Sequence, residues 1–330
     1  MAYPKPLSEK SLARLYKESG LTQAQIDYLH RLFLACANLY GALPLREVWN
    51  VHQMQAEAPK LRRKELIAFS GIARREALPY RVYEIDELYS EETRADLSRE
   101  IVSRALISYG YASVARYYGV MDSMAEVPCF IPSDILQYEH MTPSKEETAL
   151  LCFLNRLQVT EAECHPPYGN PYPCENRGKR LGEFSFLSTE ERFEEEYLAK
   201  QPRALQAFRD SVAGTEAEKI IRNFRRIDST TDIPFTRNLE IAMEELREVG
   251  VSLSERQTEK LCQLLTDFHN HTHLWNLRGW TPEELHAQYE PQAPQSLAIG
   301  PNMRKLFEDG TLSKDAFMEE LRKRGIELLE

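Results

Sequence analysis

Over residues 22–85 the spacing of apolar residues changes between the helical repeat and the alternation of a strand. The order of these segments constrains the fold more than any other feature of the chain. The first helical segment is bounded by Thr22, a suitable N-cap, and by Gly41. Its apolar residues at helical spacing are Ile26, Leu29, Phe33, Ala37 and Tyr40. The short segment ALPL follows, then helical patterns over 46–58 and 60–78 that each end before a proline. The alternating aromatic segment PYRVYEI predicts a strand.

Helix, short strand, helix, helix and strand is the element order of a winged helix, so residues 1–90 are expected to form a winged-helix-like module. Residues 91–235 are expected to form a helical middle region, with helices over 91–108 and around ASVARYYGVMDSM, a strand at VPCFIP and a Pro-rich loop over 164–184. Residues 236–330 are expected to be a C-terminal helical region. The predicted fold class is therefore mainly α, with a few short strands near the front and a multi-helix body.

The charge of the chain is unevenly distributed. Residues 1–80 contain 12 Lys and Arg against 7 Asp and Glu, while the remaining residues contain 29 against 44. The basic first part favours an anionic partner such as DNA, and the acidic remainder favours a protein partner. No apolar run is long enough to cross a bilayer, and the first residues lack the pattern of a secretory signal, so we expect a cytoplasmic protein with no membrane partner.

The third helix of the expected module carries its basic side chains on one face. Those of Arg63, Lys64, Arg74 and Arg75 lie opposite the apolar residues, and the small residues Ser70 and Gly71 separate the two basic ends. Such a face would bind phosphates of a DNA groove, and Arg81 on the following strand would add another contact. Glu65 and Glu76 lie near the apolar side, and a basic face is also compatible with plain solvation.

The segment HNHTHLWNLRGWTPEEL (269–285) contains three alternating histidines in a helical context that we expect to continue to Gly279. Residues two apart on a helix diverge, so a three-histidine metal site is not expected. Cys262, His269 and His273 share one stripe and remain an alternative ligand set for a metal-dependent enzyme. The more economical interpretation is a structural corner packed by Trp275 and Trp280.

The six cysteines are scattered, which favours reduced thiols over disulfides. Cys164, His165 and Cys174 in the Pro-rich loop are a second candidate zinc set. Their spacing does not match usual zinc loops, and no fourth ligand is evident.

The motifs ANLYGALPLREVW, PCFIPSDILQY, HTHLWNLRGWTPEEL and IGPNMRKLF resemble a group of uncharacterised Firmicute proteins that often end in a cysteine-rich SEC-C zinc tail. The residues that carry the resemblance are Asn38, Tyr40, Gly41, Pro44, Leu274, Trp275, Asn276, Gly279, Thr281 and Pro282. The histidines of the third motif depart from the usual pattern of the group, and the tail is absent. The resemblance implies a soluble bacterial cytoplasmic protein and no particular activity.

The sequence contains no glycine-rich phosphate loop and no GxSxG motif. We therefore expect a non-enzymatic binding protein without a cofactor, which binds DNA in a regulatory role through the third helix or a protein partner through the acidic body. The alternatives are a protein–protein adaptor and a metal-dependent enzyme that uses Cys262, His269 and His273.

Overall fold

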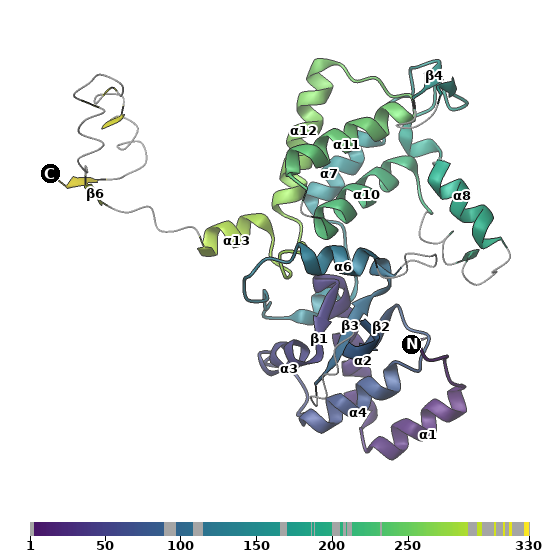
Figure 1. Cartoon of the computed structure of the whole chain (residues 1–330), viewed down its shortest axis with the longest axis vertical. Coiled ribbons are helices and arrows are strands. Elements are labelled where there is room, and N and C mark those ends of the chain that lie inside the picture. Colours follow the sequence, from purple (N-terminus) through teal and green to yellow (C-terminus); the bar gives the residue numbers. More distant parts are fainter. Residues whose placement is uncertain are drawn as a thin grey trace. The chain divides into compact units, whose positions relative to one another are not determined.

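The computed structural model describes residues 3–88, 97–107, 115–165, 170–185, 187, 189–199, 205–206, 209, 213–231 and 233–289, and short pieces at 296–298, 307, 313, 317–318 and 327–329. The chain is mainly α-helical with a few short strands, as predicted (Figure 1). Contacts divide it into two units, residues 1–282 and residues 283–330. Among the described helices, none is long and apolar enough to cross a membrane.

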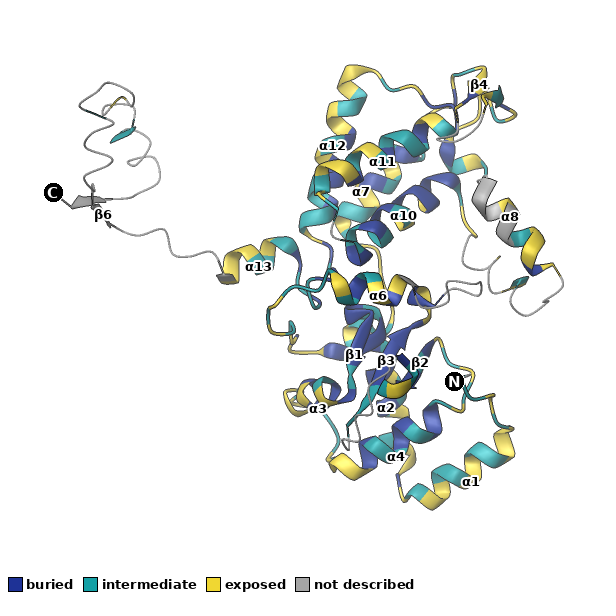
Figure 2. Ribbon diagram, in the orientation of Figure 1, coloured by how far each residue is buried: buried dark blue, intermediate teal, exposed yellow. Residues whose placement is uncertain are grey.

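The first unit begins with a helix–strand module, in which α1 was not predicted and the elements from α2 to β2 follow the predicted order. Helices α1 (Glu9–Ser19) and α2 (Gln23–Tyr40) precede strand β1 (Ala42–Pro44), helices α3 (Leu45–Gln53) and α4 (Arg63–Ala73), and strand β2 (Tyr80–Glu84). Helix α2 has the predicted boundaries, because the side chain of Thr22 caps its first turn and Gly41 ends it with a positive φ of 70°. Its apolar face is buried in the core of the module (Figure 2). In this core the rings of Phe33 and Phe69 meet edge to face.

A third strand, β3 (Arg99–Ser103), completes an antiparallel sheet in the order β1-β3-β2. The expected helix over 91–108 is therefore wrong for this part of the chain. As the central strand, β3 bonds to both neighbours, and its side chains alternate between the two faces. Ile101 packs in the core with α2 and α4, while Val102 packs on the opposite face with α6 (Ala115–Asp122). The sheet thus takes one strand from beyond residue 90.

The segment after α6 runs along α2. Residues 127–132 form no strand, in contrast to the prediction for VPCFIP. The hydroxyl of Tyr40 donates to the carbonyl of Phe130, and the amide of Gln55 donates to the carbonyl of Pro132. The short 3-10 helix η2 (Ile135–Glu139) then packs against α2. These irregular residues are fixed by side chains of the helix–strand module instead of by a partner strand.

The helical body has its own core. Helices α7 (Lys145–Leu154), α10 (Glu216–Thr230), α11 (Phe235–Glu248) and α12 (Glu255–Asn270) surround it. Ser144, Thr215 and Ser254 cap the first turns of α7, α10 and α12. The 3-10 helix η3 (Leu181–Glu183) and a short hairpin, β4 (Glu163–Cys164) with β5 (Tyr172–Pro173), contribute further side chains, and helix α8 (Thr189–Leu198) follows.

Residues 283–330 are grouped by their own contacts. Helix α13 (Pro282–Tyr289) begins one residue earlier, in the first unit. Strands β6 (Ser296–Ala298) and β7 (Glu327–Leu329) pair in parallel, and the rings of Phe307 and Phe317 lie 5.5 Å apart.

Candidate functional site

The basic residues predicted on the third helix do not share one environment. Arg63 and Lys64 occupy the first turn of α4, and both are exposed. Arg75, which follows the other end of the helix, is also exposed. Arg62 precedes α4 and was not predicted as part of the face. Its guanidinium binds the carboxylate of Glu65, although 69% of its side chain is accessible. This hydrogen bond lowers the pKa of Glu65, so its carboxylate stays charged and is neutralised by the positive charge of Arg62.

Arg74 is engaged in ion pairs within the protein. Only 14% of its side chain is exposed. Its guanidinium donates to Glu84 at 2.7 Å and to Glu87 at 2.6 Å. Glu84 ends β2 and Glu87 lies in the following short helix, α5 (Ile85–Leu88), so Arg74 fastens α4 to the sheet. The two carboxylates already engage the donors that a phosphate would need.

Arg81 is half-buried on β2. Its guanidinium carbon lies 4.7 Å from the ring centroid of Tyr3, and one nitrogen donates to the hydroxyl of Tyr83 at 3.2 Å. The stacking is a cation–π contact between β2 and the residues before α1. The described contacts of Arg81 are thus with Tyr3 and Tyr83 and not with the first turn of α4. Its contact with a phosphate stays a prediction.

The small residues in the middle of α4 make room for a protein side chain. Ser70 is completely buried. The guanidinium of Arg99, on β3, donates to the hydroxyl of Ser70 and to the carbonyl of Ile67, both at 2.8 Å. A Cβ at Gly71 would lie 3.2 Å from the same guanidinium. The prediction that Ser70 and Gly71 allow close approach of a DNA groove is thus wrong, because Arg99 covers them. No sequence signal identified Arg99, since a helix was expected there.

The histidine segment forms a corner instead of a helix. Helix α12 ends at Asn270, where the hydroxyl of Thr272 donates to the carbonyl of Phe268, and not at Gly279 as expected. Arg278 and Gly279 both have positive φ and turn the chain toward α13. Because His273 lies beyond the helix, the four-residue spacing of His269 and His273 does not place them on one helical face.

Each histidine has its own hydrogen-bond partner. His269 lies 2.6 Å from the carboxylate of Asp228, and its ring stacks on Phe235. The ring of His273 bonds to the carbonyl of Gly279 at 2.7 Å and to the hydroxyl of Tyr138 at 2.9 Å. Within the described ranges, no three His, Cys, Asp or Glu side chains could hold a metal together, so Cys262 does not join the two histidines in a site.

The corner connects distant parts of the first unit. The indole nitrogen of Trp275 donates to the carbonyl of Asn38 at 2.9 Å, and that of Trp280 donates to the carbonyl of Pro128 at 2.8 Å. The side-chain amide of Asn276 donates to two carbonyls, those of Asp228 and Thr231. The residues that first suggested a metal site therefore join α12 to α2, to the segment after α6 and to α10.

The cysteines of the Pro-rich loop are bonded to each other. Cys164 and Cys174 form a disulfide, which corrects the expectation of reduced thiols and removes both sulfurs from the candidate zinc set with His165. The hairpin brings the two residues together across a sequence separation of ten, since Cys164 pairs with Tyr172 and Cys174 directly follows β5. Cys36, Cys129, Cys152 and Cys262 are not disulfide-bonded.

No protein-family model, curated protein or solved structure matches the chain significantly. The resemblance of the four motifs to Firmicute proteins stays a prediction, and the candidate function is based on the geometry of α4 and its surroundings.

Proposed function

We propose that the helix–strand module is a winged helix that binds DNA through the first turn of α4. The support is topological. The elements from α2 to β2 follow one another as expected, and the unexpected strand β3 completes a sheet in the order β1-β3-β2. In winged helices and related helix-turn-helix modules, the helix equivalent to α4 enters the major groove.

The observation that carries the proposal is the exposure of Arg63 and Lys64 on that turn. Both lie close to the exposed Lys60, so three cations outside the Arg62–Glu65 ion pair are concentrated within five positions. A phosphate backbone binds such a cluster with release of counterions. Arg75 is a candidate for a further contact at the other end of the helix. Arg74 is not included, because Glu84 and Glu87 bind its guanidinium.

The surroundings of α4 favour contacts to phosphates over reading of bases. Arg99 covers Ser70 and Gly71, which occupy the middle of the helix. Only the first turn then presents long polar side chains to a groove. Phosphate contacts position a protein on a duplex and carry no sequence information directly. We therefore expect binding with modest discrimination between DNA sequences.

The test is the affinity of the full chain for a fluorescent DNA duplex at low salt. Arg63→Ala combined with Lys64→Ala should weaken binding at least about tenfold, equivalent to about 1.4 kcal/mol. Arg256→Ala combined with Lys260→Ala is the matched control, since it removes two exposed cations from α12 and changes the net charge equally. Equal losses in the two variants would reject a specific role for α4, and no binding by the wild type would reject the proposal.

A protein partner is the second candidate. The side chains of Met54 and Ile131 are 67% and 37% exposed. Their segments are held together, because Gln55 next to Met54 bonds to the carbonyl of Pro132 next to Ile131. Exposed apolar side chains that gather on one surface are typical of a contact with another protein. A partner captured by the wild type and lost on Met54→Asp combined with Ile131→Asp would favour this function over DNA binding.

A further inference from the structure

The disulfide between Cys164 and Cys174 lies at the edge of the helical core. Cys164 is 4% exposed and Cys174 is 9% exposed. Both contribute to the same buried cluster as Val159 and Val249, at the end of α11. Gly250, with φ of 81°, makes room for the sulfurs, since a Cβ there would lie 2.5 Å from Sγ of Cys174. The bond therefore closes the β4–β5 hairpin, and the turn after α11 packs against its sulfurs.

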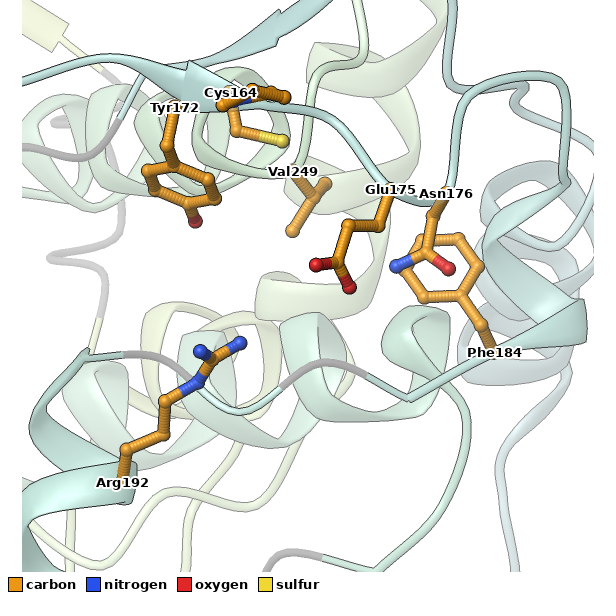
Figure 3. A pocket seen from close by; sticks show the side chains of 8 residues that line it. Cys164, Tyr172, Glu175, Asn176, Phe184, Arg192 and Val249 are labelled. Atoms are coloured by element: carbon orange, nitrogen blue, oxygen red, sulfur yellow. The ribbon is translucent and has the colours of Figure 1, made fainter.

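One of the two sulfurs is reached from a pocket. Cys164 lines a cavity of about 70 Å³, together with Tyr172, Glu175, Phe184 and Arg192, whereas Cys174 is not among its lining residues. Figure 3 shows the sulfur of Cys164 at one side of this pocket and the guanidinium of Arg192 at the other. Since a cavity holds a water molecule once about 10–15 Å³ is open to it, this cavity has room for the CH₂–SH end of a thiol.

The other sulfur, that of Cys174, lies next to a hydrogen-bond acceptor that its reduced form can use. Sγ of Cys174 lies 3.4 Å from the carbonyl oxygen of Val249. A thiol at this position can donate its proton to that oxygen, which the disulfide sulfur cannot do. Cleavage of the bond therefore leaves Cys174 with a hydrogen-bond acceptor inside the core.

From these contacts we propose that Cys164 and Cys174 are a redox-responsive pair, reduced by a small-molecule thiol that attacks Cys164 through the pocket. The attacking thiolate forms a bond to Sγ of Cys164 while the protein disulfide breaks. The electron pair of that bond goes to Sγ of Cys174, which takes up a proton from solvent and keeps it as a thiol that donates a hydrogen bond to the carbonyl of Val249. A second thiolate then attacks the sulfur of the small molecule and releases Cys164 as a thiolate, which is protonated. Two thiols are thereby oxidised to one small-molecule disulfide, and the protein gains two thiols.

The arrangement of the pair gives the exchange a direction. Thiol–disulfide exchange depends on which sulfur the thiolate can reach. The pocket exposes Cys164 to attack and makes Cys174 the leaving group. Glutathione is a suitable probe, because its cysteine side chain is small enough to enter the cavity.

The experiment treats the oxidised full chain with reduced glutathione, quenches the reaction with acid at short times and maps the mixed disulfide by peptide mass spectrometry. We expect the mixed disulfide on Cys164 to exceed that on Cys174 at least tenfold, with both thiols free at long times. Cys152 is exposed and not disulfide-bonded, so its peptide serves as an internal control for quenching. Equal labelling of Cys164 and Cys174 would overturn the proposed route.

The test is repeated with oxidised glutathione on the Cys174→Ser and Cys164→Ser variants. The wild-type experiment decides the proposal by itself if either variant fails to fold. Cys164 in the first variant should form the mixed disulfide at least tenfold faster than Cys174 in the second. Protein purified without reductant in which both thiols are alkylated directly, and in which oxidised glutathione forms no intramolecular bond, would overturn the pairing itself.

Discussion

Replacement of Arg74 should destabilise the fold instead of weakening DNA binding alone. The guanidinium is 14% exposed and holds two carboxylates, Glu84 and Glu87, which are 29% and 9% exposed. Removal of one partner from a buried ion pair costs about 3–5 kcal/mol, because the other charge stays buried without compensation. Here Glu84 keeps Arg99 at 2.8 Å, and Glu87 keeps the backbone N–H of Glu84. We therefore expect a loss near the lower limit, about 3 kcal/mol.

The assay is thermal unfolding of the Arg74→Ala variant, followed by circular dichroism at neutral pH. A loss of about 3 kcal/mol should lower the Tm by at least about 5 °C. Arg75→Ala is the matched control, since Arg75 is adjacent in sequence and exposed, and its replacement should change stability by less than about 0.5 kcal/mol. If Arg74→Ala melted with the wild type and lost DNA binding, Arg74 would be a contact residue and our account of its ion pairs would be refuted.

Two further predictions concern the sheet and the corner. Burial raises the pKa of the Glu100 carboxyl from 4.5 to about 7, although the hydroxyl of Tyr117 donates to it at 2.5 Å. The contribution of Glu100 to stability is therefore complete below pH 4.5 and lost as the pH rises to about 7, a change of about 3 kcal/mol. Urea unfolding should show this decline relative to Glu100→Gln, and parallel pH profiles would contradict it. Gly41→Ala should cost about 2–4 kcal/mol, because its Cβ would lie 2.5 Å from the ring of Trp275. Gly20→Ala, with φ of 73° and open space around the Cβ, should cost only about 1 kcal/mol. Equal losses in thermal unfolding would argue against tight packing of the corner on α2.

Local sequence signals were sufficient to predict an element where it has its own capping residues and a regular spacing of apolar residues. The limits of α2 follow from Thr22, Gly41 and the apolar residues between them, and each of these signals acts within one helical turn. The order of helices and strands up to β2 could be predicted for the same reason. The mainly helical character of the remainder follows from similar periods, and the caps at Ser144, Thr215 and Ser254 mark where α7, α10 and α12 begin.

Strand β3 could not be predicted from its period. Ile101 and Val102 are both buried, because α6 covers one face of the sheet and the core of the module covers the other. A strand that is buried on both faces has no alternation of apolar and polar residues, so a short apolar run resembles a helix. The position of Arg99 over Gly71 was missed with the strand, although it decides which part of α4 is accessible.

The corner and the basic face depend on contacts between residues far apart in the sequence. Trp275 bonds to the carbonyl of Asn38, which no local pattern near either residue indicates. Arg74 and Arg75 are adjacent and equally basic, yet only the contacts of Arg74 with Glu84 and Glu87 separate the buried residue from the exposed one. The disulfide was missed because cysteine count and spacing do not reveal the pairing across a hairpin.

The most direct test of DNA binding by α4 is the salt dependence of the affinity for a duplex. Each phosphate neutralised contributes about 0.9 to the slope of log K against log salt concentration. The wild type should show a steep negative slope, and Arg63→Ala combined with Lys64→Ala should reduce its magnitude by about 1.8. Arg256→Ala combined with Lys260→Ala should leave the slope unchanged. A slope that is the same in the wild type and in the α4 variant, or no binding at low salt, would contradict the account.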